Sequence, residues 1–251
     1  MSPLIFLLII AALYLASKPK FRLFVERDGM YLSREWTSFV NAFFISLVVC
    51  SHSLIHFETS IRDYYYEKIT ASGIALFGQL MVTTFFFYSG YGIMLSLLNR
   101  KEYTKTLIHT RFSNLSINFV LAVGIYFIAH CILRREIILS DFLGGLYDCS
   151  ILGNPTWFIL MTLLIYVLTY VCFSFHNKKN TNIIIIFFTI LLTIIVFFVS
   201  KFKPLHWVNT LLCFPAGMFY YLKGESIEKL IKKTRIPSII YALIASVNFF
   251  L

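Results

Sequence analysis

Residues 73–98 read GIALFGQLMVTTFFFYSGYGIMLSLL, a run of 26 residues without a single charged side chain. A hydrocarbon core about 30 Å thick takes roughly 17 to 25 helical residues to cross. Helices buried in soluble proteins rarely stay free of charge for so long. The run therefore predicts a membrane-spanning α-helix.

Similar apolar runs recur along the whole chain. Of its 251 residues, 59% are hydrophobic and only 14% are charged, whereas soluble domains carry about 25% charged residues. The composition and the runs together predict an all-α fold, a polytopic membrane helix bundle of about eight transmembrane helices. The other candidate spans are 3–17, 36–55, 112–133, 156–175, 181–200, 207–222 and 236–251.

The net charge of +10 could indicate nucleic-acid binding, so the positions of the Lys and Arg residues matter more than their number. Nearly all of them lie between spans, and most lie in the odd-numbered loops. Because cytoplasmic loops are the ones enriched in Lys and Arg, we expect the odd loops in the cytoplasm, contact with membrane lipid and no nucleic-acid partner. The odd loops are 18–35, 99–112, 176–181 and 223–236, and the even loops are 56–72, 134–155 and 201–206.

No linker and no internal repeat divides the chain, and no soluble domain fits between the spans. We therefore expect one integral membrane domain over residues 1–251. The even loops 56–72 and 134–155, placed outside, are rich in Tyr, Asp and Glu. A polar substrate would meet the protein there.

His52 is the titratable residue that stands out inside a span, and such a residue is a functional hypothesis by default. Asn41 precedes it by eleven residues, close to three helical turns, so the two side chains share one face. Arg34 lies seven residues further back on roughly the same face. Alternatively, His52 only hydrogen-bonds a neighbouring helix. His56 could form a metal-binding pair with it, but no third ligand follows at a suitable spacing, so we expect no metal.

The stretch NAFFISLVVCSH (residues 41–52) resembles a helix of the acyltransferase-3 family, which O-acylates cell-surface polysaccharides. That family has a basic residue, ten intervening residues and then His. Asn41 occupies the position of the usual Arg, and Asn can hydrogen-bond but carries no charge.

Further motifs resemble the same family in the expected order. FFFYSGY (85–91) is similar to its Phe-Phe-x-x-Ser-Gly-Phe/Tyr motif, and Arg111, after Arg100, Lys101 and Lys105, resembles its cytoplasmic basic cluster. NPTWFIL (154–160), with Tyr166 beyond it, resembles the Trp-Phe-Leu segment, and FPAGM (214–218) resembles the Pro-x-Gly helix. Together these motifs cover about residues 33–222.

The resemblance implies a multi-pass O-acyltransferase of a bacterial inner (cell) membrane. It would move an acyl group, most simply acetyl, from acyl-CoA (acetyl-CoA) to a hydroxyl of a cell-surface polysaccharide or its lipid-linked sugar precursor, without a metal. His52 would accept the hydroxyl proton or take the acyl group first, with Asn41 as its partner. The expected donor-binding residues are Arg111, Lys105, Ser89 and Gly90, and the expected acceptor-binding residues are Arg34, Trp157 and Tyr166.

Other interpretations of these residues stay open. Arg111 could be an ordinary topology charge, Ser89-Gly90 could serve helix packing, and Trp157 fits an interfacial aromatic belt. A flippase or transporter of lipid-linked sugar would use broken helices, and Pro215 and Gly217 interrupt one span. However, no Asp or Glu lies well inside a span to couple ions.

A third interpretation is an inactive relative that acts as a partner subunit. The exchange of the usual Arg for Asn41 favours it. The family has about ten helices in a longer chain, so we expect its last helices to be missing here. An oligomer could supply them from another copy.

Overall fold

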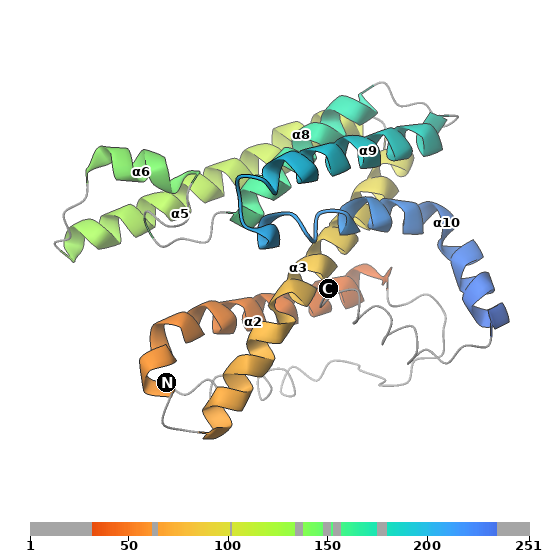
Figure 1. Cartoon of the computed structure of the whole chain (residues 1–251). Coiled ribbons are helices and arrows are strands. Elements are labelled where there is room, and N and C mark those ends of the chain that lie inside the picture. Colours follow the sequence, from red (N-terminus) through yellow and green to blue (C-terminus); the bar gives the residue numbers. More distant parts are fainter. Residues whose placement is uncertain are drawn as a thin grey trace. The chain divides into compact units, whose positions relative to one another are not determined.

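The computed structural model describes residues 32–61, 65–100, 102–133, 138–147, 152, 157–174 and 180–234. The spans expected at 3–17 and 236–251 lie outside the described residues. Every regular element within the described ranges is helical (Figure 1). The all-α prediction is therefore confirmed.

The contacts divide the chain into two compact units. One comprises residues 1–88 and 228–251, and the other comprises residues 89–227. Two helices contribute to both units, α3 (Tyr65–Asn99) and α10 (Cys213–Thr234).

In the first unit, α2 (Arg34–Ile61) contains the span expected at 36–55. The Ser33 hydroxyl accepts a hydrogen bond of 3.2 Å from the Trp36 backbone N–H, which satisfies a donor of the first turn. The Phe44 ring meets the Phe85 ring of α3 edge to face, with 6.5 Å between centroids. This contact fixes α2 against the first part of α3.

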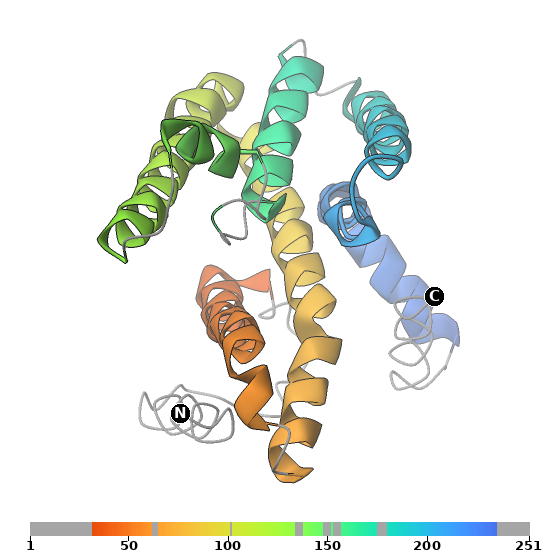
Figure 2. The ribbon, with the colours of Figure 1, turned by 60° about the vertical axis from the view of Figure 1, so that its left-hand side comes forward.

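In the second unit, a long helical segment runs from Tyr103 to Ile132 and changes from α-helix to π-helix and back to α-helix. It consists of α4 (Tyr103–Thr106), the π-helix η2 (Leu107–Phe112) and α5 (Ser113–Ile132). Alongside α5 lie α6 (Leu139–Gly145) and α8 (Trp157–Phe173), and α8 also packs against α9 (Thr181–Val199) (Figures 1 and 2). A short 3₁₀ turn, η4 (Leu205–Trp207), precedes α10.

One core cluster of this unit joins α5 to the segment before α8. Phe119 and Val123 of α5 pack with Leu152, and all three are at least nine-tenths buried. His130 Nε2 lies 3.2 Å from the Leu152 carbonyl oxygen. Because a carbonyl can only accept, this nitrogen carries the proton and donates.

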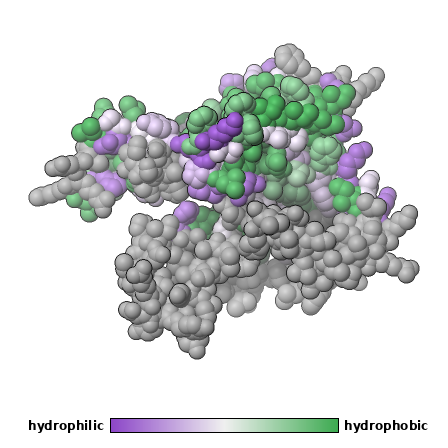
Figure 3. Space-filling model, viewed as in Figure 1, coloured by the Kyte–Doolittle hydropathy of each residue, from purple (hydrophilic) through white to green (hydrophobic). Residues whose placement is uncertain are grey.

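The length and composition of the helices indicate that this protein lies in a lipid bilayer. Within the described residues, three helical segments are long and apolar enough to cross a membrane, Leu80–Asn99, Tyr103–Ile132 and Thr181–Val199, and Trp157–Phe173 is a shorter apolar helix. On α9, Ile186, Phe187 and Ile190 are exposed, and Figure 3 shows hydrophobic surface over α8 and α9. Such a continuous apolar face suits lipid better than water.

Two expected boundaries are wrong. The loop expected at 99–112 is helical from Tyr103 onward, because Tyr103 and Leu107, four residues apart, are both buried on one face of the helix. The helix expected from Trp207 begins only at Cys213 and continues to Thr234, so it also replaces most of the loop expected at 223–236.

Pro215 explains where α10 begins. It is the third residue of the helix, in the first turn, whose N–H groups have no partner within the helix. Proline is tolerated there because the donor it lacks is not needed. Pro215 and Gly217 therefore lie in one uninterrupted helix rather than breaking a span.

Candidate functional site

The residues that the sequence singles out around His52 all lie on α2. Arg34 is its first residue and is exposed, Asn41 is half-buried, and His52 is exposed. The rise of a helix places Asn41 and His52 about 16 Å apart along the axis. The Asn41 side-chain oxygen is buried and has no hydrogen-bond partner among the described residues. One helix therefore carries an accessible imidazole and a buried, unsatisfied amide oxygen.

A second group of polar residues surrounds the phenol of Tyr103, and we refer to Ser96, Arg100, Tyr103, Arg111 and Tyr166 as the Tyr103 cluster. The Tyr103 side chain is only 4% exposed. Its hydroxyl oxygen is buried and has no hydrogen-bond partner among the described residues, and Ser96, both arginines and the Tyr166 hydroxyl lie near enough to act on it electrostatically. The Arg111 guanidinium lies 5.9 Å from the centre of the Tyr103 ring, within the range of a cation–π contact.

The backbone that carries Arg111 is unusual. Arg111 belongs to the π-helical segment η2, where the helix is wider and the Ser113 hydroxyl donates to the Ile108 carbonyl oxygen five residues back, at 3.0 Å. Such π segments are rare and frequently occur at functional sites. Arg111 is exposed, so its charge is available to a ligand as well as to the Tyr103 ring.

Lys105, the second residue expected to bind the donor, is on α4 and pairs with Glu102 at 3.1 Å. Both side chains are about two-thirds exposed or more, so water screens the pair and it adds little stability. The neighbouring carboxylate nevertheless offsets part of the positive charge of Lys105. Arg111 is the stronger candidate of the two for an anionic ligand.

The two aromatic residues expected to bind the acceptor lie in different surroundings. Trp157, the first residue of α8, packs edge to face against His206 of η4, with 5.6 Å between ring centroids. Tyr166, nine residues further along, is buried within the Tyr103 cluster. The structure therefore groups Tyr166 with Arg111 rather than with Trp157.

The Ser89-Gly90 step of α3 lies against the start of α10. A Cβ atom added to Gly90 would overlap the Phe214 carbonyl oxygen and would lie 2.8 Å from the carbonyl carbon. Only glycine permits this approach of one backbone to another. Gly90 thus has a packing role, and Ser89 beside it is half-buried.

Sequence reasoning missed Tyr103, which lies at the centre of its cluster. The spacing of Tyr103, Leu107 and Phe112, with apolar residues four and five apart, was the available signal for a helical, partly buried segment. The charges between them favoured a loop instead. The π-helical turn leaves no comparable signal in the sequence.

Comparison with protein families gives one match. The profile of an acyltransferase domain, Acyl_transf_3, covers residues 35–251. Searches of curated proteins and of solved structures give no match.

Proposed function

Because the chain belongs to the acyltransferase-3 family over residues 35–251, we propose that it is a membrane O-acyltransferase whose donor is a cytoplasmic acyl-CoA. The group transferred is most simply acetyl. The acceptor is a hydroxyl of a cell-surface polysaccharide or its lipid-linked precursor. The protein would cross a bacterial inner membrane about eight times.

The observation that carries this proposal is the family match, and the contacts between helix ends support the expected topology. Trp157 and His206, whose rings are in contact, flank loops that the charge pattern places outside. His130 and Leu152, joined by a hydrogen bond, flank the same outer loop. Helix ends that are expected on the same side of the membrane are therefore in contact with each other.

The proposed reaction needs one base. The acceptor oxygen attacks the thioester carbonyl, an ester C–O bond forms and the thioester C–S bond breaks. His52 takes the proton of the hydroxyl as the bond forms and then gives it to the departing thiolate of CoA, which returns the imidazole to its neutral form. His is suited to this role because its ordinary pKa is close to neutral pH.

The experiment compares surface polysaccharide from a host that lacks this gene, complemented with wild type or with variants. NMR of the purified polysaccharide measures O-acyl groups per repeat unit. Wild type should restore these signals and His52→Ala should reduce them at least about a hundredfold, the usual contribution of general acid–base catalysis.

The matched control is His109→Ala, which removes an exposed imidazole of η2 that has no role in the proposed reaction. Its O-acyl content should equal that of wild type. Equal content in wild type and His52→Ala would overturn the assignment of the base.

One observation favours a second candidate, an inactive partner subunit. Asn41 stands where the family has a basic residue, so the positive charge expected at this position of α2, about three turns before His52, is absent. Asn41→Arg tests this possibility in the same complementation assay. An inactive wild type with activity restored by Asn41→Arg would replace the enzyme proposal with the partner-subunit proposal.

A further inference from the structure

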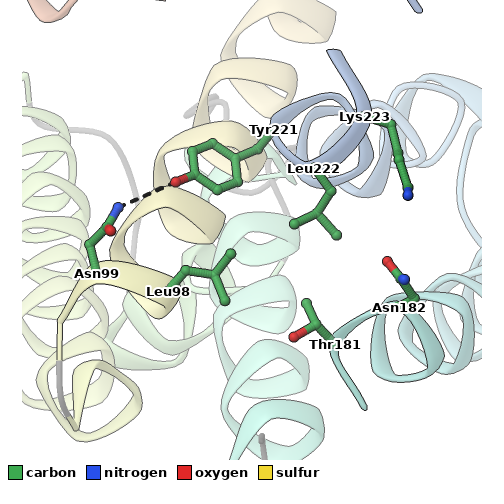
Figure 4. A pocket seen from close by; sticks show the side chains of 7 residues that line it. All are labelled: Leu98, Asn99, Thr181, Asn182, Tyr221, Leu222 and Lys223. Carbon is green, nitrogen blue, oxygen red and sulfur yellow. Dashed lines mark hydrogen bonds between the residues drawn. The ribbon is translucent and has the colours of Figure 1, made fainter. Parts of the chain in front are cut away.

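A cavity of about 470 Å³ lies within the second unit, at the point where three helices come together. It is bounded by the last residues of α3, the first residues of α9 and the middle of α10 (Figure 4). Its volume falls in the range of small-molecule sites, about 300 to 1,000 Å³. The polar residues that line it are Asn99, Thr181, Asn182, Tyr221 and Lys223, together with two leucines.

The Tyr221 hydroxyl is a hydrogen-bond donor of this cavity, and two contacts hold the Tyr221 side chain in place. The Tyr221 ring packs edge to face on the Tyr91 ring, with 5.3 Å between centroids. The Asn99 side-chain nitrogen donates to the Tyr221 oxygen at 3.3 Å and to the Leu95 carbonyl at 2.8 Å. Because the phenol oxygen accepts from Asn99, its own proton is left to donate to a ligand.

The charge in the lining is positive. Lys223 extends from α10 toward Asn182 of α9 (Figure 4), and none of the described residues that line the cavity is Asp or Glu. Lys223 has no ion-pair partner among the described residues, so no carboxylate in that part of the chain neutralises it. An ammonium, a phenol and an amide around one space form a set of donors suited to phosphate oxygens.

The cavity also lies at one predicted side of the membrane. Its three walls adjoin the segments 99–112, 176–181 and 223–236, which the positive-inside rule assigns to the cytoplasm. A soluble phosphorylated metabolite would meet the protein on that side.

We propose that this cavity binds a phosphate group of a soluble ligand through Lys223, Tyr221 and Asn182. The identity of the ligand rests on the proposed function, in which it is the phosphorylated end of acyl-CoA. A phosphate of an anionic lipid headgroup has the same chemistry, and the experiment separates these two sources.

Binding is measured on the full chain in nanodiscs of neutral phosphatidylcholine, by calorimetry with CoA as the probe. Lys223→Met should weaken CoA binding about tenfold or more, because hydrogen bonds to charged groups contribute that much. Tyr221→Phe keeps the ring contact with Tyr91 and loses only the hydroxyl, and it should weaken binding by about threefold or more. Inorganic phosphate should compete with CoA.

The matched control is Lys229→Met, which removes an exposed lysine further along the same helix and outside the cavity. It should bind CoA as wild type does. Equal CoA affinity in wild type and Lys223→Met would overturn the proposal. So would loss of CoA binding in nanodiscs containing phosphatidylglycerol, since the lipid headgroup would then occupy the cavity in place of CoA.

The binding measurement requires neither an acceptor nor transfer. If the surface polysaccharide carried no O-acyl groups, the proposed function would fail, while CoA binding that depends on Lys223 would still support the cavity assignment. Loss of O-acyl groups in His52→Ala with intact CoA binding would support both proposals separately.

Discussion

At the scale of single residues, Asn41 combines a structural penalty with a position in the candidate site. Its side-chain oxygen is buried and has no hydrogen-bond partner in the described ranges. Leaving a buried acceptor unsatisfied costs about 1 to 3 kcal/mol. Residues with such a penalty are often retained because function needs them.

Asn41→Leu, which has nearly the same shape, should therefore raise the stability of the protein by about 1 kcal/mol and lower its O-acyl transfer. Thermal unfolding in detergent measures the first effect and NMR of surface polysaccharide the second. A variant that is more stable and fully active would show that Asn41 has no part in the reaction.

Gly90 gives a second prediction because a side chain there would collide with a backbone rather than with a flexible neighbour. The Cβ of Gly90→Ala would overlap the Phe214 carbonyl group, so α3 and α10 would have to move apart. The expected loss is about 1 to 3 kcal/mol or more, measured as a lower unfolding temperature.

Gly92→Ala is the matched control, two residues away on the same helix. A Cβ atom there meets nothing within 4 Å, and replacing a glycine inside a helix by alanine gains about 0.5 to 1 kcal/mol. Gly92→Ala should therefore raise the unfolding temperature. A similar loss in both variants would contradict the close approach at Gly90.

At the scale of elements, the start of α10 depends on Pro215. Pro215→Ala should change the stability by less than about 1 kcal/mol, because the first turn needs no N–H at that position. Phe219→Pro, on the same helix and exposed, should cost about 3 kcal/mol because it removes an interior hydrogen bond. Thermal unfolding compares the two, and a large gain in stability in Pro215→Ala would mean that the helix begins earlier than Cys213, because an interior proline would then have been removed.

The helices could be predicted from the sequence where apolar residues continue without interruption. The spans expected at 156–175 and 181–200 match α8 and α9 to within two residues. The expected loop 99–112 was wrong because its charges concealed the burial of Tyr103 and Leu107. Charge patterns indicate which side of a membrane a segment faces, and they say little about whether it is helical.

At the scale of the whole molecule, the alternation of basic and less basic loops makes a prediction about sidedness. Glu102 lies between α3 and α4, and Lys201 lies after α9; both are exposed. Three predicted spans, 112–133, 156–175 and 181–200, separate them, so they should lie on opposite sides of the membrane.

Single cysteines at these two positions, in a variant without native cysteines, test this arrangement with a membrane-impermeant thiol reagent. The Lys201→Cys variant should react in intact spheroplasts, and Glu102→Cys should react only after permeabilisation. Labelling of both positions from the same side would contradict the proposed topology and the cytoplasmic location of the cavity.

The candidate site was only partly predictable at this scale. His52, Asn41 and Arg34 follow from a residue pattern along one helix, which α2 contains in full. The cavity depends on Asn99, Asn182 and Lys223, which are far apart in the sequence and meet only through packing. Local sequence patterns do not show which distant residues pack together, so the cavity could not be predicted from the sequence.

The length of α3 has a consequence for the bilayer. Its uncharged stretch, residues 73–98, extends about 39 Å at 1.5 Å per residue, against a hydrocarbon thickness of about 30 Å. To match, the helix would have to tilt by about 40°, the upper end of the range observed for membrane helices, or the surrounding lipid would have to thicken. From this hydrophobic mismatch we expect the protein to be sensitive to lipid chain length.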